Sequence, residues 1–255
     1  MSEEKSLLLT DLTPAEIRAH LDRDRRLIVP VGACDQYGPH LPLGASTLVV
    51  EAFARDLSRD FGVLRAPAVP YGVNVPADRR FTGTMGLRQK TLHALLNDIL
   101  GCLDGDGFNE FILLTVHDYD SHVEAMATVT GSEARIRAIE LLNIDVSAFL
   151  SGEPTPEHGG ELLTSLMLHL YPDRVRMAAA IDHVPTDRIV STLRRTPRIP
   201  ANSPGVLGNP TLATAEKGRQ LYEYIHQKIR TRVFVDPAES PDNSRNTTGT
   251  ARVLP

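Results

Sequence analysis

The chain has 255 residues, of which 42% are hydrophobic, so it is long enough to bury a substantial core. Its formal net charge is −5 and no long run carries one sign, which argues against a nucleic-acid or anionic-membrane partner. No apolar stretch approaches the roughly 20 residues of a membrane-spanning helix, and the acidic, polar N-terminus does not resemble a secretory signal. The two cysteines, Cys34 and Cys102, lack metal-type or disulfide spacing, so we expect a reduced, cytoplasmic protein.

The first half of the chain alternates predicted helices with short apolar strands. Thr13 has the position of a helix cap, Pro14 that of the first turn and Glu16 that of the third residue after the cap, which predicts a helix to about Asp22. Apolar runs and helical spacing then predict, in order, a strand over 27–31, a helix over 47–61, a strand over 63–69 and a helix over 91–103. The segment 70–84 is rich in Pro, Gly and Arg and is predicted to be irregular.

The second half continues the alternation. The predicted elements are a strand over 110–116, a helix over 123–138, a strand over 139–144 and helices over 161–170 and 212–229. This order favours an α/β fold, a three-layer αβα sandwich with a mostly parallel sheet. We expect one domain over residues 1–235, followed by a polar, non-periodic and disordered tail over 236–255.

Polar residues that could carry chemistry lie at the ends of these predicted elements. Asp35 and His117 each come just after a predicted strand, and ligands of parallel sheets bind beyond the carboxyl ends of the strands, so the two residues could meet there. Glu157-His158-Gly159-Gly160 precedes a predicted helix, whose N-terminus favours an anion or a carbonyl oxygen. The sequence therefore places its candidate chemistry at one edge of the sheet.

Several motifs occur together in one order from about residue 27 to 230. They are Asp35-Gln36-Tyr37-Gly38-Pro39-His40-Leu41-Pro42, Phe81-Thr82-Gly83-Thr84, Thr115-Val116-His117, Glu157-His158-Gly159-Gly160, Gly205-Val206-Leu207-Gly208-Asn209-Pro210 and Thr214-Ala215-Glu216-Lys217-Gly218. In this combination the chain resembles the creatininase (creatinine amidohydrolase) family. The resemblance implies the αβα fold, hydrolysis of a C–N bond in a small substrate, one or two divalent metal ions at the strand ends, and a homo-oligomer, often a hexamer.

The chain departs from the metal-binding pattern that this resemblance implies. Asp35 and His117 match family ligands, but Tyr37 replaces a ligand histidine and Ser46 replaces the bridging aspartate. Leu163 replaces the glutamate of the family's Glu-Thr-Ser motif. The histidine of the family's middle loop has no clear match near Ala77 and Asp78, and that loop is one residue longer.

These departures set our expectation for the cofactor. A dinuclear site is not expected, because two dications without a bridging carboxylate would repel each other. A single Zn, Mn or Fe ion on Asp35 and His117, helped by Asp118, Asp120 or Glu161, remains open. A metal-free pocket is favoured, because two firm ligands fall short of the usual three or more.

His158 is the main catalytic candidate, with Glu157 beside it as the partner that sets its protonation. The alternative is a structural turn histidine. Tyr37 could donate a hydrogen bond to a substrate oxyanion or fill the vacated metal space. His117 could be a catalytic residue, a ligand or a structural histidine. The remaining candidates are substrate-binding residues, namely Ser46, Asp118, Tyr119, Glu161, Arg79 and Arg80, and the two arginines could instead be solvated loop charges.

We therefore expect an enzyme that acts on a small cyclic or carbonyl-bearing, nitrogen-containing metabolite, with a setting in specialised biosynthesis. His158 and Glu157 would supply acid–base chemistry for C–N hydrolysis or for cyclisation or dehydration. One alternative is a metal-dependent amidohydrolase with a rebuilt mononuclear site. Another is an inactive homologue that binds a ligand or serves as a scaffold for a partner.

Overall fold

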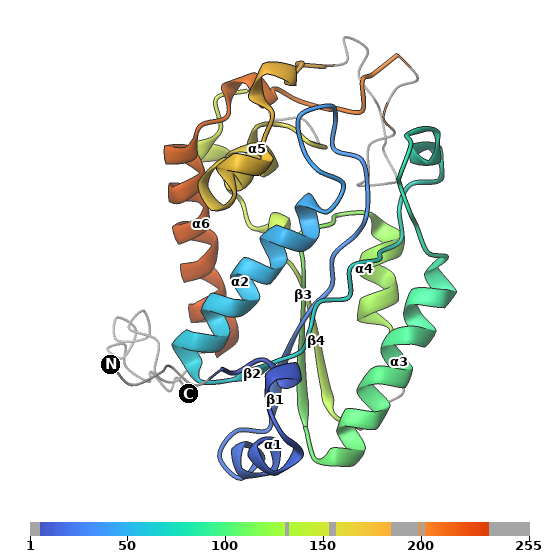
Figure 1. Ribbon diagram of the computed structural model, residues 1–255, viewed down its shortest axis with the longest axis vertical. Helices are drawn as coiled ribbons and strands as arrows, with labels where there is room; N and C mark the ends of the chain where they lie inside the picture. The colour runs from blue at the N-terminus through green and yellow to red at the C-terminus, as the bar shows by residue number, and fades with distance from the viewer. Residues whose placement is uncertain (1–5, 131–132, 153–156, 185–198, 200–201, 235–255) are drawn as a thin grey trace, which may run out of the picture.

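The computed structural model describes residues 6–130, 133–152, 157–184, 199 and 202–234. Four strands form one parallel sheet in the order β2–β1–β3–β4, with helices on both faces (Figure 1). The strands are β1 Arg26–Pro30, β2 Leu64–Arg65, β3 Glu110–Thr115 and β4 Arg135–Glu140. The predicted αβα architecture with a parallel sheet is confirmed.

Local signals account for the helix ends. The helices are α1 Pro14–Leu21, α2 Ala45–Phe61, α3 Gln89–Asp106, α4 Asp120–Ala127, α5 Glu161–Leu170 and α6 Ala215–Ile229. Helix α1 begins with the predicted reciprocal pair, in which the Thr13 side chain accepts from the Glu16 N–H and the Glu16 carboxylate accepts from the Thr13 N–H. Helices α2 and α3 end at Gly62 and Gly107, whose positive φ angles suit glycine.

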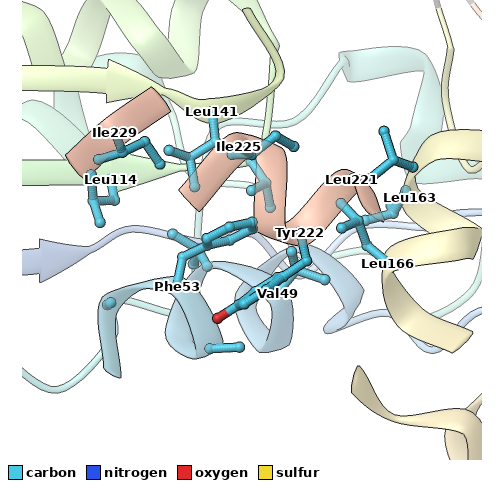
Figure 2. Close-up of a cluster of buried hydrophobic side chains, with 14 of the residues drawn as sticks. Val49, Phe53, Leu114, Leu141, Leu163, Leu166, Leu221, Tyr222, Ile225 and Ile229 are labelled. Carbon is cyan, nitrogen blue, oxygen red and sulfur yellow. The ribbon is translucent and has the colours of Figure 1, made fainter. Parts of the chain in front are cut away.

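Alternating strand residues divide the core between the two faces of the sheet. Ile28 and Ile112 point to the face covered by α2, α5 and α6, whereas Leu27 and Phe111 point to the face covered by α3 and α4. Figure 2 shows the first cluster, where Phe53 of α2 stacks on Tyr222 of α6 with ring centroids 4.2 Å apart. Removing one such ring costs about 3–5 kcal/mol of stability.

The structure shortens the predicted strand over 63–69 to Leu64–Arg65 and also corrects two adjacent predicted elements. The helix predicted over 123–138 is shorter, since α4 ends at Ala127, and the last strand begins earlier, at Arg135. The β-branched residues Thr128, Val129 and Thr130 follow the helix end and disfavour its continuation. The predicted tail over 236–255 lies outside the described residues. Among the described residues, no helix is long and apolar enough to cross a membrane.

Candidate active site

The candidate site lies at the carboxyl ends of β1 and β3, where open parallel sheets bind ligands. Asp35 lies in the loop after β1 and His117 follows β3. Asp78 belongs to a short 3₁₀ helix, Pro76–Arg80, between β2 and α3, and His158 immediately precedes α5. The ends of β1 and β3 and the start of α5 lie toward the top of Figure 1.

Asp35, Asp78 and His158 form a tight cluster. One ligand atom from each lies within 4.8 Å of the other two, and both aspartates have a solvent exposure of 0%. Asp35 Oδ1 accepts a hydrogen bond from the Gln36 N–H at 2.8 Å. Asp35 Oδ2 and both carboxylate oxygens of Asp78 are buried and have no hydrogen-bond partner among the described residues. The cluster therefore combines two buried acids with three unsatisfied oxygens.

Burial controls the electrostatics of this cluster. It raises the pKa of Asp35 to about 7, with a further increase from the nearby charge of Asp78. Burial also raises the pKa of Asp78 to about 6, although the positive charge of Arg80 acts in the opposite direction. The environment thus disfavours two unpaired carboxylate charges at this position.

The ring of His158 is held in one tautomer. Its Nε2 lies 2.6 Å from the backbone oxygen of Gln36, and because a carbonyl oxygen only accepts, Nε2 must carry the proton. The side-chain nitrogen of Gln36 also lies 3.0 Å from Nε2, a longer contact that does not change this assignment. The ring stacks on Tyr37 with centroids 4.9 Å apart. Burial lowers the pKa of His158 to about 4, so the ring is neutral near pH 7 and keeps its lone pair on Nδ1.

Glu157 fixes the turn that carries His158. Its carboxylate oxygens accept hydrogen bonds from the N–H groups of Glu161 and Leu162 at 3.0 and 2.9 Å, at the start of α5. Burial raises the pKa of Glu157 to about 7, and the two N–H donors oppose that shift. The structure thus places the Glu157 carboxylate on the helix N-terminus.

His117 uses both ring nitrogens away from the cluster. Nε2 donates to the backbone oxygen of Val73 at 2.9 Å, which leaves Nδ1 to accept from the Tyr37 hydroxyl at 3.4 Å. The neighbouring His122 accepts from the Val73 N–H at 3.2 Å, so the two histidines together hold both backbone groups of Val73. Burial lowers the pKa of His117 to about 4 and raises that of Tyr37 well above 10. His117 is not part of the three-residue cluster.

Two other predicted residues make contacts within the protein. The Ser46 hydroxyl accepts from the Ala33 N–H at 3.1 Å and lies 3.2 Å from the Ala33 carbonyl oxygen. Glu161 is buried in an ion pair with Lys217 and also accepts from the N–H groups of Ser151 and Gly152.

Asp118 and Tyr119 are half-buried in the loop after His117. Burial raises the pKa of Asp118 to about 6, and the nearby charge of Asp120 adds to the increase. Tyr119 instead contributes to the wall of a neighbouring cavity. Of these two adjacent candidates, Tyr119 therefore lines the cavity and Asp118 does not.

This cavity of about 260 Å³ is formed by the same loops. Arg79 and Arg88 contribute to it, whereas Arg80 donates to the Ile199 carbonyl and lies over the Phe81 ring at 4.8 Å. The full lining is Val73, Asn74, Val75, Pro76, Arg79, Gly86, Leu87, Arg88, Gln89, Tyr119 and Ser121. Asn74 donates from Nδ2 to the Cys34 carbonyl at 2.9 Å, and its Oδ1 is buried without a hydrogen-bond partner among the described residues. The cavity thus offers two cations, Arg79 and Arg88.

Sequence reasoning missed three residues of this region: Asp78, Asn74 and Arg88. All three lie in the irregular segment between β2 and α3, which has no periodicity from which to place a side chain. The one available signal for Asp78 was its proximity to the position of the family's middle-loop histidine. Cys34 is half-buried, and burial raises the pKa of its thiol, which disfavours the reactive thiolate.

The donor set of the cluster fits a divalent cation. Two carboxylates and an imidazole are ligands that Zn, Mn and Fe accept, and two negative charges balance one dication. His117 and the residues that replace family ligands, Tyr37 and Ser46, do not fit an ion. The Tyr37 hydroxyl occupies the lone pair of His117, and Ser46 bonds to the backbone.

Comparisons with known proteins agree with this fold. The chain is 28% identical over 256 residues to a creatinine amidohydrolase of Pseudomonas putida, covering 88% of this chain and 95% of the relative. It is 29% identical over 218 residues to a mycofactocin precursor peptide peptidase of Mycobacterium tuberculosis, covering 77% and 79%. A solved variant creatininase described as the Zn-Zn type superposes with a TM-score of 0.74 at 26% identity, covering 89% and 98%. Residues 10–233 match the family described as creatininase, creatinine amidohydrolase. With this match extending over most of its length, the chain belongs to the creatininase family.

Proposed function

We propose that this protein hydrolyses a C–N bond next to a carbonyl group in a small, nitrogen-containing substrate, and that Asp35, Asp78 and His158 form the reacting centre. The observation that carries the proposal is the convergence of these three side chains beyond the sheet, with three buried carboxylate oxygens left unsatisfied. The names of the two relatives, an amidohydrolase and a peptide peptidase, support C–N cleavage as the reaction class.

The surroundings of His158 support its role in that centre. The Gln36 carbonyl holds the proton on Nε2, and the stacked ring of Tyr37 fixes the plane of the imidazole. The lone pair on Nδ1 is thus available to take a proton or to bind a cation in the reacting centre. Glu157 acts as a positioning residue, because it anchors the turn at the start of α5 instead of bonding to the ring.

The neighbouring cavity suggests a substrate that carries a carboxylate. Arg79 and Arg88 can form charge-assisted hydrogen bonds to such a group. A peptide with a free C-terminus meets this description as a substrate, and the acid formed when a creatinine-like ring opens meets it as a product. The peptide relative also agrees with a setting in specialised biosynthesis.

The other functions predicted from sequence are less well supported. Cyclisation or dehydration would use the same proton-transferring groups, but neither relative named above is described by such a reaction. A binding or scaffold protein would gain nothing from two buried acids without partners, since unpaired buried carboxylates oppose folding. A role of Asp35 and Asp78 in hydrolysis would explain why the fold retains two acids that oppose its stability.

The test is an assay of the purified full chain against creatinine, other cyclic amides and short peptides, with products identified by mass spectrometry. His158→Ala should lower kcat/KM by about 10²- to 10⁴-fold, the range expected when a proton-handling group is lost. His226→Ala, in the last turn of α6, is the matched control and should retain activity. Hydrolysis that persists in His158→Ala would remove this residue from the reacting centre.

A second assay tests the carboxylate. Arg79→Gln should raise KM about 10- to 100-fold for a substrate with a free carboxylate, because a charge-assisted hydrogen bond contributes about 1.5–3 kcal/mol. It should leave KM unchanged for the matching carboxamide. Equal losses for both substrates would show that Arg79 does not recognise the carboxylate.

A further inference from the structure

The starting observation is a local imbalance of charge and hydrogen bonding. Asp78 is fully buried, and neither of its carboxylate oxygens has a hydrogen-bond partner in the part of the chain that the structure describes. The same holds for Asp35 Oδ2, a few ångströms away. Buried charges in proteins are normally paired or bound to a metal. By contrast, the buried carboxylate of Glu161 has Lys217 and two backbone N–H donors. Among the described residues, Glu161 therefore has an ion-pair partner, whereas Asp35 and Asp78 have none.

We propose that Asp35, Asp78 and His158 bind a single divalent cation, at a site that differs in its ligands from the two-ion pattern implied by the family resemblance. Three donor atoms within 4.8 Å of one another place a central ion about 2.8 Å or less from each, against about 2.0–2.2 Å in a relaxed zinc site. A sub-ångström inward movement completes the coordination. His158 would bind the ion through Nδ1, because Nε2 donates to the Gln36 carbonyl.

The structure limits the site to one ion. The Tyr37 hydroxyl donates to the only lone pair of His117, and Ser46, which replaces the bridging aspartate implied by the resemblance, bonds to the Ala33 backbone. Neither residue offers a charged ligand. The Tyr37–His117 hydrogen bond thus takes the place of the second ion and keeps the same loops together.

The donor set defines the class of cation. Two carboxylate oxygens and one imidazole nitrogen suit Zn²⁺, Mn²⁺ or Fe²⁺, and three protein ligands leave a position open, as in catalytic zinc sites. When bound, such an ion supplies a positive charge that polarises a carbonyl oxygen and lowers the pKa of water. This use of the ion rests on the proposed function, whereas its binding does not. The site also differs from the metal-free pocket that the sequence favours.

The alternative to a bound cation is a proton shared between the carboxylates of Asp35 and Asp78. Two buried carboxylates can lower their repulsion by holding one proton between them, as acids do in a common site. Arg80, whose charge reaches Asp78, supplies part of the compensation in that case. The two solutions differ in whether the protein binds a metal with defined stoichiometry.

The experiment measures Mn²⁺ binding to the full chain after dialysis against a chelator, by titration calorimetry and elemental analysis. We expect about one equivalent per chain and a Tm that rises with Mn²⁺ concentration. Asp78→Asn should weaken binding by at least about 100-fold. It should also raise the Tm of the metal-free protein, because it removes an unpaired buried charge, a result that a merely misfolded variant would not give.

His117→Gln and Asp118→Asn are the matched controls and should still bind about one equivalent. Tyr37→His combined with Ser46→Asp should raise the stoichiometry toward two. Less than about a tenth of an equivalent in the unmodified chain, or loss of binding in His117→Gln with undiminished binding in Asp78→Asn, would overturn the proposal. One equivalent without hydrolysis of any substrate would leave the site standing and remove the proposed function. Hydrolysis by a chain that binds no Mn²⁺ would do the opposite, because it would support the proposed function and overturn the metal site.

Discussion

At the scale of single residues, the buried acid Glu161 differs from Asp35 and Asp78, because it has a cation as its partner. Glu161 is neutralised by Lys217, whose ammonium group also donates to the Leu212 carbonyl at 3.1 Å. These contacts explain why the chain carries a lysine early in α6. They also show that Glu161, a candidate site residue by sequence, is engaged in joining α5 to α6.

The ion pair leads to a stability prediction. Lys217→Met leaves the Glu161 charge buried without a cation and should lower the free energy of unfolding by about 3–5 kcal/mol. The double variant Lys217→Met/Glu161→Gln should recover much of that loss, because no charge remains. Urea unfolding at pH 7 measures all three proteins. A single variant as stable as the original chain would show that the pair contributes little.

The pH dependence of this pair has a definite sign. The Lys217 hydrogen bond and the backbone donors hold the pKa of Glu161 below its usual value of 4.5, although burial opposes them. The contribution of the pair is therefore complete above pH 4.5 and is lost as the pH falls through the lowered pKa. The stability difference between the original chain and Lys217→Met should shrink in that acidic window, as measured by urea unfolding. A difference that grows there would contradict the assignment.

At the scale of elements, α5 and α6 approach closely enough to require a glycine. A Cβ added at Gly218 would lie 1.8 Å from the Ser165 backbone oxygen, so the two helices would have to separate. In α3, by contrast, a Cβ added at Gly105 would meet no atom within 4 Å. The same substitution should therefore have opposite effects in these two helices.

Gly218→Ala should destabilise the protein by about 1–3 kcal/mol through overpacking, despite the helix preference of alanine. Gly105→Ala should stabilise it by up to about 1 kcal/mol through that same preference. Thermal and urea unfolding of both variants provide the comparison. Equal effects at the two positions would mean that the α5–α6 contact adjusts without cost.

At the scale of the whole molecule, the sheet separates two apolar clusters and carries the candidate site at one end. The family resemblance further implies a homo-oligomer, often a hexamer, and this remains a prediction. Tyr71 and Met85, in the irregular segment of the site, are 44% and 50% exposed, and an interface there would cover them. Light scattering after size exclusion should give about six times the chain mass of 28.0 kDa. A mass of one chain would contradict the expectation.

The sequence by itself determined the layered fold and most of its elements. The capping pair at Thr13 and Glu16, and the helix from Glu161 to Leu170, depend on residues only a few positions apart, so their signals can be read locally. It also placed Asp35 and His117 beyond the strands. The boundary between α4 and β4 was less accessible, because a short helix and an edge strand leave weak periodicity.

Only the tertiary structure decided which side chains meet. It brings Asp78, from a segment without periodicity, against Asp35 and His158, and it turns His117 toward Val73 and Tyr37. No local pattern encodes these contacts, because they depend on how separate loops pass one another above the sheet. The protonated nitrogen of each histidine likewise follows from a carbonyl group contributed by another loop. Chemistry at this site is therefore set by long-range packing, whereas the framework beneath it is set by periodicity and caps.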